Sequence, residues 1–270
     1  MTLILKGIML VSIGTAVFCF LANIFRSIAL SNRPKLSKEY LSAELHEFIL
    51  TLAVVFFGWI GWTDRAPNPS KGQYNQPILL VPGYGMNRLS LWFLKVYLQQ
   101  QGHRWVWNIN HPVLKDDLEA YAEALCEKAE HLCFRSGETK VILVAHSMGG
   151  LVSRLAIQKR PERFKGLISL GTPWKSTAAH IFTIGRSGQQ MNLNSPHLCH
   201  TWDQEVPLHS IYSLQDWVIL PPTHSIVEGA HNHILPNVGH LSFLCSTRSF
   251  NLIQNVIQSE IQCNEANCSS

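Results

Sequence analysis

The feature of the sequence that most restricts its fold is an apolar segment that runs directly into a serine and two glycines. Residues 141–145 read Val-Ile-Leu-Val-Ala, and the sequence His-Ser-Met-Gly-Gly follows, up to Gly150. A continuous short apolar run is typical of a strand covered on both faces of a parallel sheet. A serine in a sharp strand-to-helix turn presents its hydroxyl above the sheet as a nucleophile, and small residues such as Ala145 and Gly149 let strand and helix approach. The segment therefore predicts a nucleophile at Ser147, with an ordinary helix cap as the alternative role of this serine.

Strand-like and helix-like segments alternate along the rest of the chain after the first 76 residues. Apolar runs predict strands at 78–81, 105–107, 141–145, 167–170, 208–212 and near Ile234. Periodic apolar residues predict helices over 88–101, 116–134, 148–158 and 250–261. Alternation of this kind predicts an α/β fold with a mostly parallel sheet and helices on both faces. The irregular segment 174–205 is too long for a plain connection, so we expect it to form a lid or cap.

Two uncharged apolar runs precede this domain, at 7–25 and 48–62. The first is 19 residues long, close to the length that spans a bilayer, and it lacks a signal-peptide cleavage site. The second is only 15 residues long and ends in two tryptophans, so a helix lying on the membrane or docked on the domain is the alternative to a span. We therefore expect a membrane anchor over 1–62, a linker rich in Pro, Ser and Gly over 63–76, and a catalytic domain over 77–270.

The charges beside these runs predict an orientation. Lys6 and the terminal amine precede the first run, and four cationic residues lie between the runs, namely Arg26, Arg33, Lys35 and Lys38. Because cationic loops stay in the cytoplasm, a helical hairpin would place residues 63–270 outside, which we expect to be the bacterial periplasm. A single uncleaved anchor is expected to give the same location.

Composition excludes several function classes. Only 15% of residues are charged and the net charge is +4, which is too weak a basic footprint for a nucleic-acid binder. Six cysteines lie outside the first apolar run, at 126, 133, 199, 245, 263 and 268, and they are either partly paired in disulfides or buried as free thiols. Cys126 and Cys133 lie too far apart on one helix to pair. No paired Cys-x-x-Cys spacing occurs, so no metal site is expected, and no cofactor is expected either.

The motif around Ser147 resembles the lipase and esterase branch of the α/β-hydrolase superfamily, including bacterial triacylglycerol lipases and GPI inositol-deacylases. The resemblance covers about residues 76–262, and Gly-Thr-Pro at 171–173 adds to it. That family orders its triad as nucleophile, acid and histidine. It implies Asp216, in Ser-Leu-Gln-Asp-Trp-Val-Ile-Leu-Pro, as the acid, with Asp203 and Glu228 in reserve. It implies His240, in Gly-His-Leu-Ser-Phe, as the base, ahead of His224, His231 and His233.

The same resemblance implies an oxyanion hole built from two backbone N–H groups. Met148, directly after the nucleophile, would supply the first. The loop Val-Pro-Gly-Tyr-Gly-Met-Asn at 81–87 would supply the second, from Tyr84 or else from Gly85, with Asn87 bracing the loop. Many relatives carry histidine before the first glycine of this loop, whereas this chain carries Pro82.

These observations predict a membrane-anchored serine hydrolase that cleaves carboxylic esters, with acyl lipids as the expected substrates. The expectation of lipid rests on the membrane location and on apolar residues within 174–205, namely Trp174, Ile181, Phe182, Ile184, Met191 and Trp202. An acyltransferase or a glycolipid deacylase with the same triad is the first alternative, and a non-catalytic membrane scaffold is a distant one. The sequence leaves the oligomeric state and the head group of the substrate open.

Overall fold

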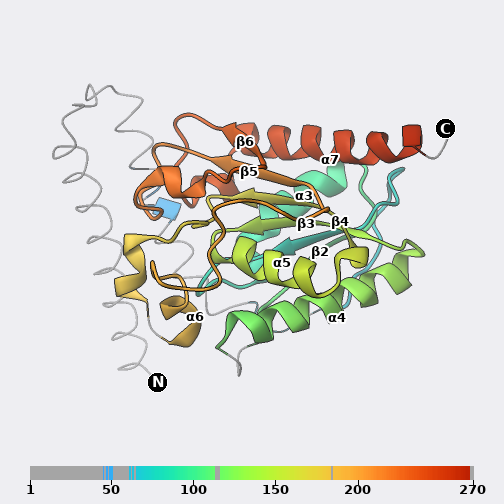
Figure 1. Cartoon of the computed structure of the whole chain (residues 1–270). Coiled ribbons are helices and arrows are strands. Elements are labelled where there is room, and N and C mark those ends of the chain that lie inside the picture. The colour runs from blue at the N-terminus through green and yellow to red at the C-terminus, as the bar shows by residue number, and fades with distance from the viewer. Residues whose placement is uncertain are drawn as a thin grey trace, which may run out of the picture.

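The domain is built on a six-stranded sheet in which every neighbouring pair of strands is parallel (Figure 1). The strand order is β2-β1-β3-β4-β5-β6. The strands are β1 (Ile78–Val81), β2 (Val106–Asn108), β3 (Val141–His146), β4 (Phe164–Leu170), β5 (Leu208–Tyr212) and β6 (His231–Ile234). The predicted α/β class is confirmed, and the sheet is parallel throughout rather than mostly parallel.

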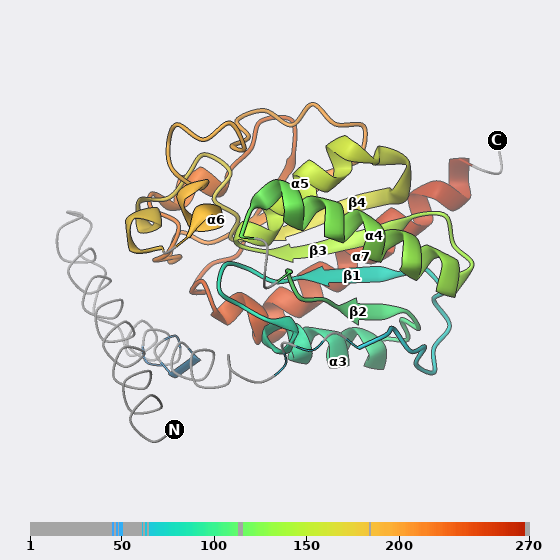
Figure 2. The ribbon, with the colours of Figure 1, turned by 90° about the horizontal axis from the view of Figure 1, so that it is seen from below.

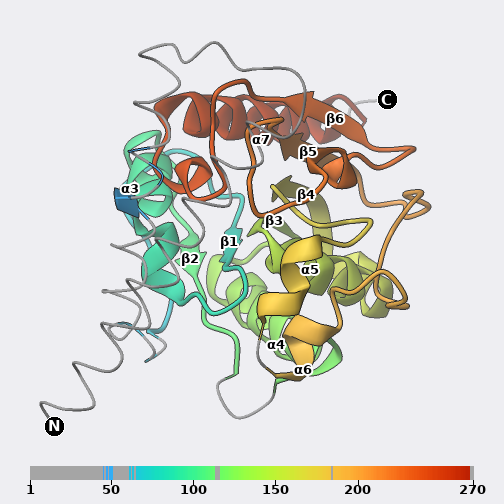
Figure 3. The same ribbon diagram turned by 90° about the vertical axis from the view of Figure 1, so that its left-hand side faces the viewer.

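Helices cover both faces of this sheet, as Figures 2 and 3 show from two further directions. The helices are α3 (Trp92–Gln100), α4 (Leu118–Ser136), α5 (Met148–Lys159), α6 (Arg186–Gln189) and α7 (Thr247–Asn267). The pair α4 and α5 packs on one face and shares a core with it, while α3 and α7 share a second core on the opposite face. Burial of each strand on both faces explains why the strands are apolar without alternation.

In this computed structural model the described residues are 45, 47, 49–50, 61, 63, 65–112, 116–183 and 185–267. The apolar run 7–25 and most of the run 48–62 lie outside the described residues. Within the described part of the chain, no helix combines the length and the apolar character that a membrane span requires.

Several element boundaries differ from those predicted. The predicted helix over 88–101 begins with a 3₁₀ turn, Arg88–Leu91, because the Asn87 side chain accepts the Leu89 N–H at 2.9 Å and caps that turn. The last helix extends beyond both predicted ends. His231 and His233 lie in the edge strand β6, the strand predicted near Ile234.

The crossing of α5 over the end of β1 requires a small residue at position 149. A Cβ atom on Gly149 would lie 2.6 Å from the carbonyl oxygen of Pro82 and 2.8 Å from that of Val81. Both obstacles are backbone atoms, so only a glycine lets the helix start this close to the strand.

The segment 174–205 contains a 3₁₀ turn, Ala178–Phe182, and the short helix α6. Figure 2 shows α6 at the end of the sheet toward which the strands run. Trp174, Met191 and Trp202, which the sequence offered as lipid-binding residues, are instead buried in the core that includes α4 and α5. That part of the expectation was wrong, because an apolar side chain in an irregular segment can equally fill the core. Ile181 remains 66% exposed.

Four of the six cysteines are described with their side chains, and each is a free thiol. Cys126, Cys133 and Cys199 are buried. Burial raises the pKa of the Cys126 thiol to about 11 and that of Cys245 also to about 11. These four are therefore unreactive thiols rather than disulfide partners.

The described residues near the N-terminus contact the domain at two places. Glu47 is buried against the loop that follows His240. Gly61 and Thr63 accept hydrogen bonds through their carbonyl oxygens from the side chains of Asn110 (3.0 Å) and Arg88 (2.9 Å). Both flanks of the run 48–62 thus touch the same folded unit.

Candidate functional site

Ser147 lies in a strained turn between β3 and α5. Its φ is 53° and its ψ is −125°, a region that residues other than glycine rarely adopt. Two neighbours hold this conformation: the Ser147 N–H donates to the Leu170 carbonyl at 2.9 Å, and its carbonyl accepts the Thr172 hydroxyl at 2.9 Å. The strain and its bracing match the sharp nucleophile turn that the sequence predicts.

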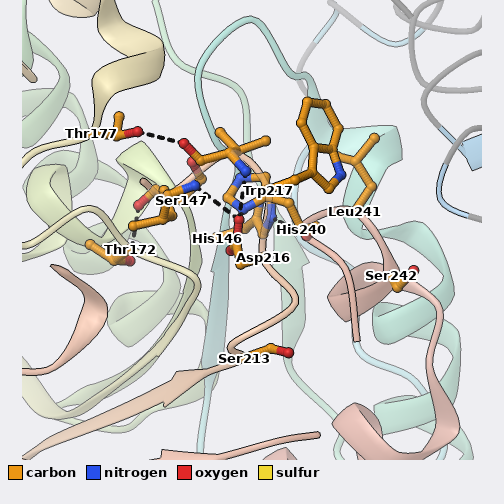
Figure 4. A network of polar contacts seen from close by, with 12 residues as sticks. His146, Ser147, Thr172, Thr177, Ser213, Asp216, Trp217, His240, Leu241 and Ser242 are labelled. Carbon is orange, nitrogen blue, oxygen red and sulfur yellow. Dashed lines mark hydrogen bonds and ion pairs between the residues drawn. The ribbon is translucent and has the colours of Figure 1, made fainter. Parts of the chain in front are cut away.

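Asp216 holds His240 by a hydrogen bond of 2.7 Å between Nδ1 of the imidazole and Oδ2 of the carboxylate (Figure 4). The other carboxylate oxygen accepts the backbone N–H groups of Val218 and Ile219, both at 2.9 Å. Asp216 is 1% and His240 is 4% exposed. Because a carboxylate only accepts, Nδ1 of His240 carries the hydrogen, and Nε2 remains available as a base.

The segment that follows β4 joins Ser147 to this pair. Leu170 and Thr172 bond the Ser147 backbone, and Gly171 lies between them. A Cβ atom on Gly171 would lie 2.8 Å from Asp216 Oδ2 and 3.2 Å from His240 Nδ1. The predicted nucleophile, acid and base are therefore gathered at the carboxyl ends of the strands, where α/β folds bind ligands.

His146 is part of this arrangement, although the sequence gave no reason to select it. Its ring packs against that of His240 with centroids 4.6 Å apart, and its Nε2 lies 3.0 Å from the His240 carbonyl oxygen. Burial lowers the pKa of His146 well below its ordinary value, so the ring is neutral and donates from Nε2. This hydrogen bond from His146 fixes the position of the His240 backbone.

The loop proposed to complete an oxyanion hole lies beside the nucleophile. A Cβ atom on Gly83 would lie 3.0 Å from Cβ of Ser147, a tighter contact than most side chains make, so the glycine eases this close approach. Tyr84 follows directly and is partly buried against the core, and Gly85 turns the chain at a φ of 66°. Met148 is the first residue of α5. The oxyanion roles of Tyr84 and Met148 remain predictions.

His111 braces the same loop, again without a signal in the sequence. Its Nε2 lies 2.8 Å from the carbonyl oxygen of Pro82, and its ring stacks on Tyr121 with centroids 4.6 Å apart. The ring is buried, and this burial lowers its pKa to about 4. A neutral ring that donates to Pro82 therefore supports the loop at every pH above that value.

The reserve acids and histidines lie elsewhere. Asp203 is exposed and accepts from the side chain of its neighbour Gln204 at 2.6 Å, and Glu228 is exposed. His224 Nδ1 lies 3.0 Å from the Ser176 carbonyl oxygen. His231 and His233 stack on His209 at the sheet edge. Among the described residues, no group of three or more His, Cys, Asp or Glu side chains is arranged to hold a metal ion.

The buried His111 predicts a loss of stability in mild acid. Below pH 6.5 the unfolded chain binds a proton at position 111 that the folded protein binds only near pH 4. The free energy of unfolding therefore falls as the pH falls through this window, by about 3 kcal/mol in total. His111→Gln keeps a donor for Pro82 but does not titrate, so between pH 7 and pH 5 the wild type should lose about 2 kcal/mol more than the variant.

Thermal unfolding of both proteins at the two pH values measures this difference. His103, His146 and His233 also have lowered pKa values, but they are present in both proteins. The difference in stability loss between wild type and variant therefore reports His111. An equal drop in Tm for wild type and variant would contradict the prediction.

Comparison with known proteins agrees with this geometry. Residues 77–190 match the family described as alpha/beta hydrolase fold. No curated protein matches the chain significantly by sequence.

Similar solved structures of low sequence identity include lipases and an esterase. Lipase B of Aspergillus fumigatus superposes with a TM-score of 0.61 at 14% identity, over 88% of this chain and 79% of that chain. The mature lipase BlEst2 of Bacillus licheniformis gives 0.57 at 16% identity, over 73% and 96%. A thermophilic esterase of Thermogutta terrifontis gives 0.54 at 18% identity, over 72% and 93%. The parallel sheet, the family match and these structures together show that the chain has the α/β-hydrolase fold.

Proposed function

We propose that this protein is a serine hydrolase of carboxylic esters that acts through Ser147, His240 and Asp216. The observation that carries the proposal is the 2.7 Å hydrogen bond between Asp216 and His240, next to a serine held in a strained strand-to-helix turn. The backbone N–H groups of Val218 and Ile219 orient the Asp216 carboxylate, which in turn orients the imidazole of His240 beside the nucleophile turn, as a catalytic triad requires.

The proposed reaction follows from these positions. Ser147 Oγ attacks the ester carbonyl carbon while His240 Nε2 takes the hydroxyl proton, and Asp216 stabilises the imidazolium that results. The N–H groups of Met148 and Tyr84 would stabilise the oxyanion. The tetrahedral intermediate collapses, His240 returns the proton to the departing alcohol, and an acyl-enzyme remains. Water, activated by His240, then releases the acid.

We propose apolar acyl esters, including membrane lipids, as the substrates. Ile181 and Leu193 are 66% and 69% exposed in the segment 174–205. Helix α6 of this segment lies at the end of the sheet where the strands finish (Figure 2). The apolar run 7–25 supports a membrane location for the same chain. The solved relatives include lipases of other organisms, which is consistent with this class of substrate.

A fluorophosphonate probe tests the proposed function directly, because it reacts with an activated serine whatever the natural substrate. The full chain should be labelled, and Ser147→Ala should abolish the labelling. Absence of labelling in the folded wild type would favour the non-catalytic scaffold. A panel of p-nitrophenyl esters of increasing chain length then defines the acyl preference.

Asp216→Asn should lower kcat for a p-nitrophenyl ester by on the order of 10³- to 10⁴-fold. The amide would still accept the backbone donors of Val218 and Ile219 through Oδ1, but its NH₂ group would face Nδ1 of His240. That contact favours the tautomer with hydrogen on Nε2, which cannot take the serine proton. Asp203→Asn, at the exposed reserve acid, is the matched control and should leave kcat within about twofold. A larger loss of kcat in Asp203→Asn than in Asp216→Asn would contradict the assignment of Asp216 as the acid and favour Asp203.

A further inference from the structure

The buried carboxylate of Glu47 makes four hydrogen bonds to the two loops that carry Asp216 and His240. Its Oε1 accepts the indole N–H of Trp217 at 3.2 Å and the backbone N–H of Leu241. Its Oε2 accepts the backbone N–H of Ser242 at 2.9 Å and the Ser242 hydroxyl. Glu47 is 3% exposed. A carboxylate with its two oxygens engaged in this way is held in one position.

The donors are the immediate neighbours of the acid and the base. Trp217 follows Asp216 in the chain, and Leu241 follows His240. Figure 4 shows Trp217, Leu241 and Ser242 around the Asp216–His240 pair. One side chain that lies 170 residues before the first loop and 194 before the second therefore bridges both loops and fixes the spacing between them.

The fold leaves a space for this carboxylate at Gly239. A Cβ atom at that position would lie 2.5 Å from both Cδ and Oε2 of Glu47. The glycine that precedes the base thus has a role that the sequence motif alone does not explain. It gives Glu47 access to the backbone donors on the far side of His240.

The pKa of the Glu47 carboxyl lies above its ordinary value, chiefly because the side chain is buried. The hydrogen bonds from Ser242 and Leu241 and the nearby His240 act in the opposite direction, while Asp216 adds to the increase. The hydrogen bonds of the carboxyl oxygens, rather than its charge, place Glu47 between the two loops.

We propose that Glu47 is a positioning residue that holds the Asp216 and His240 loops at the spacing required for proton transfer. This inference rests on the proposed function, since it assigns Glu47 to the support of that same site. Glu47 is not itself a catalytic residue, because it contacts backbone and neighbouring side chains rather than the reacting atoms. The segment that contains it becomes part of the catalytic unit rather than a separate anchor.

Kinetics of the full chain test the proposal. Glu47→Ala should lower kcat for a p-nitrophenyl ester on the order of 10- to 100-fold with KM nearly unchanged, because displacement of a catalytic group costs rate rather than binding. Glu47→Gln, which keeps Oε1 as an acceptor, should recover part of the rate. Ile49→Ala, at an exposed position on the same segment, is the matched control and should retain the wild-type kcat.

Active-site titration with the fluorophosphonate probe separates positioning from misfolding. If kcat per labelled site returns to the wild-type value in Glu47→Ala, the residue only supports folding and the proposal is overturned. The proposal is also overturned if kcat of Glu47→Ala equals the wild-type value before it is normalised to the number of labelled sites.

A contact measurement that needs no activity keeps this inference distinct from the proposed function. Gly239→Ala should lower Tm by several degrees in the wild type, because the added methyl meets Glu47, and by clearly less in the Glu47→Ala background. Equal decreases in the two backgrounds would show that Glu47 and Gly239 are not in contact. If the wild type is not labelled by the probe but the two substitutions are coupled, the contact stands and the proposed function fails.

Discussion

Replacing Ser147 by alanine is expected to lower kcat for ester hydrolysis by on the order of 10⁴-fold or more. The serine lies at a φ of 53° between β3 and α5, a conformation that its backbone partners Leu170 and Thr172 stabilise. Alanine keeps this backbone, so the loss reports the hydroxyl alone. His240→Ala should cost a similar factor, because without the imidazole the serine keeps its proton.

The double variant Ser147→Ala/His240→Ala should lose little beyond either single variant, because residues that act as one unit are not additive. Ser153→Ala is the matched control: this serine is also buried on α5, where its hydroxyl donates to the Gly149 carbonyl at 2.7 Å. It should keep kcat within about threefold. Additive losses at Ser147 and His240 would mean that the two residues act in separate steps, and the triad assignment would fail.

The strands and the candidate triad could be predicted from the sequence because both depend on local patterns. Buried parallel strands are continuous apolar runs, and β5 was placed with its observed bounds. The roles predicted for Ser147, Asp216 and His240 came from three short motifs. Each motif is a contiguous stretch of sequence in a turn or loop. A local pattern also explains the predicted close approach at Gly149.

The supporting residues could not be found in this way, because their contacts join distant segments. His146, His111 and Glu47 act on residues 94, 29 and about 195 positions away along the chain, and no local pattern indicates those contacts. Trp174 and Trp202 illustrate the opposite limit. The sequence shows that they are apolar, but only the structure shows that they pack in the core rather than on the surface.

Membrane orientation is the second property with a large expected effect. We expect alkaline phosphatase fused after Ser270 to be active and green fluorescent protein at the same position to be dark, because the charges beside the apolar runs predict a periplasmic location for residues 63–270. Glu47 contacts the His240 loop, and Gly61 and Thr63 contact Asn110 and Arg88, so both ends of the run 48–62 lie beside the same domain. These contacts favour a single uncleaved anchor at 7–25, which is expected to give the same location, over a span at 48–62 that would separate Glu47 from residues 63–270.

A second reporter inserted after Lys38 distinguishes the two kinds of anchor. With a single anchor at 7–25, both reporters are expected in the periplasm, which agrees with the Glu47 contact. A periplasmic C-terminus with a cytoplasmic position 38 would mean that 48–62 crosses the membrane and would overturn the contact. Two cytoplasmic reporters would keep the contact and overturn the predicted location. The triad assignment is independent of all three outcomes, because the Asp216–His240 hydrogen bond and the hydrogen bond from Thr172 to Ser147 lie within residues 77–270.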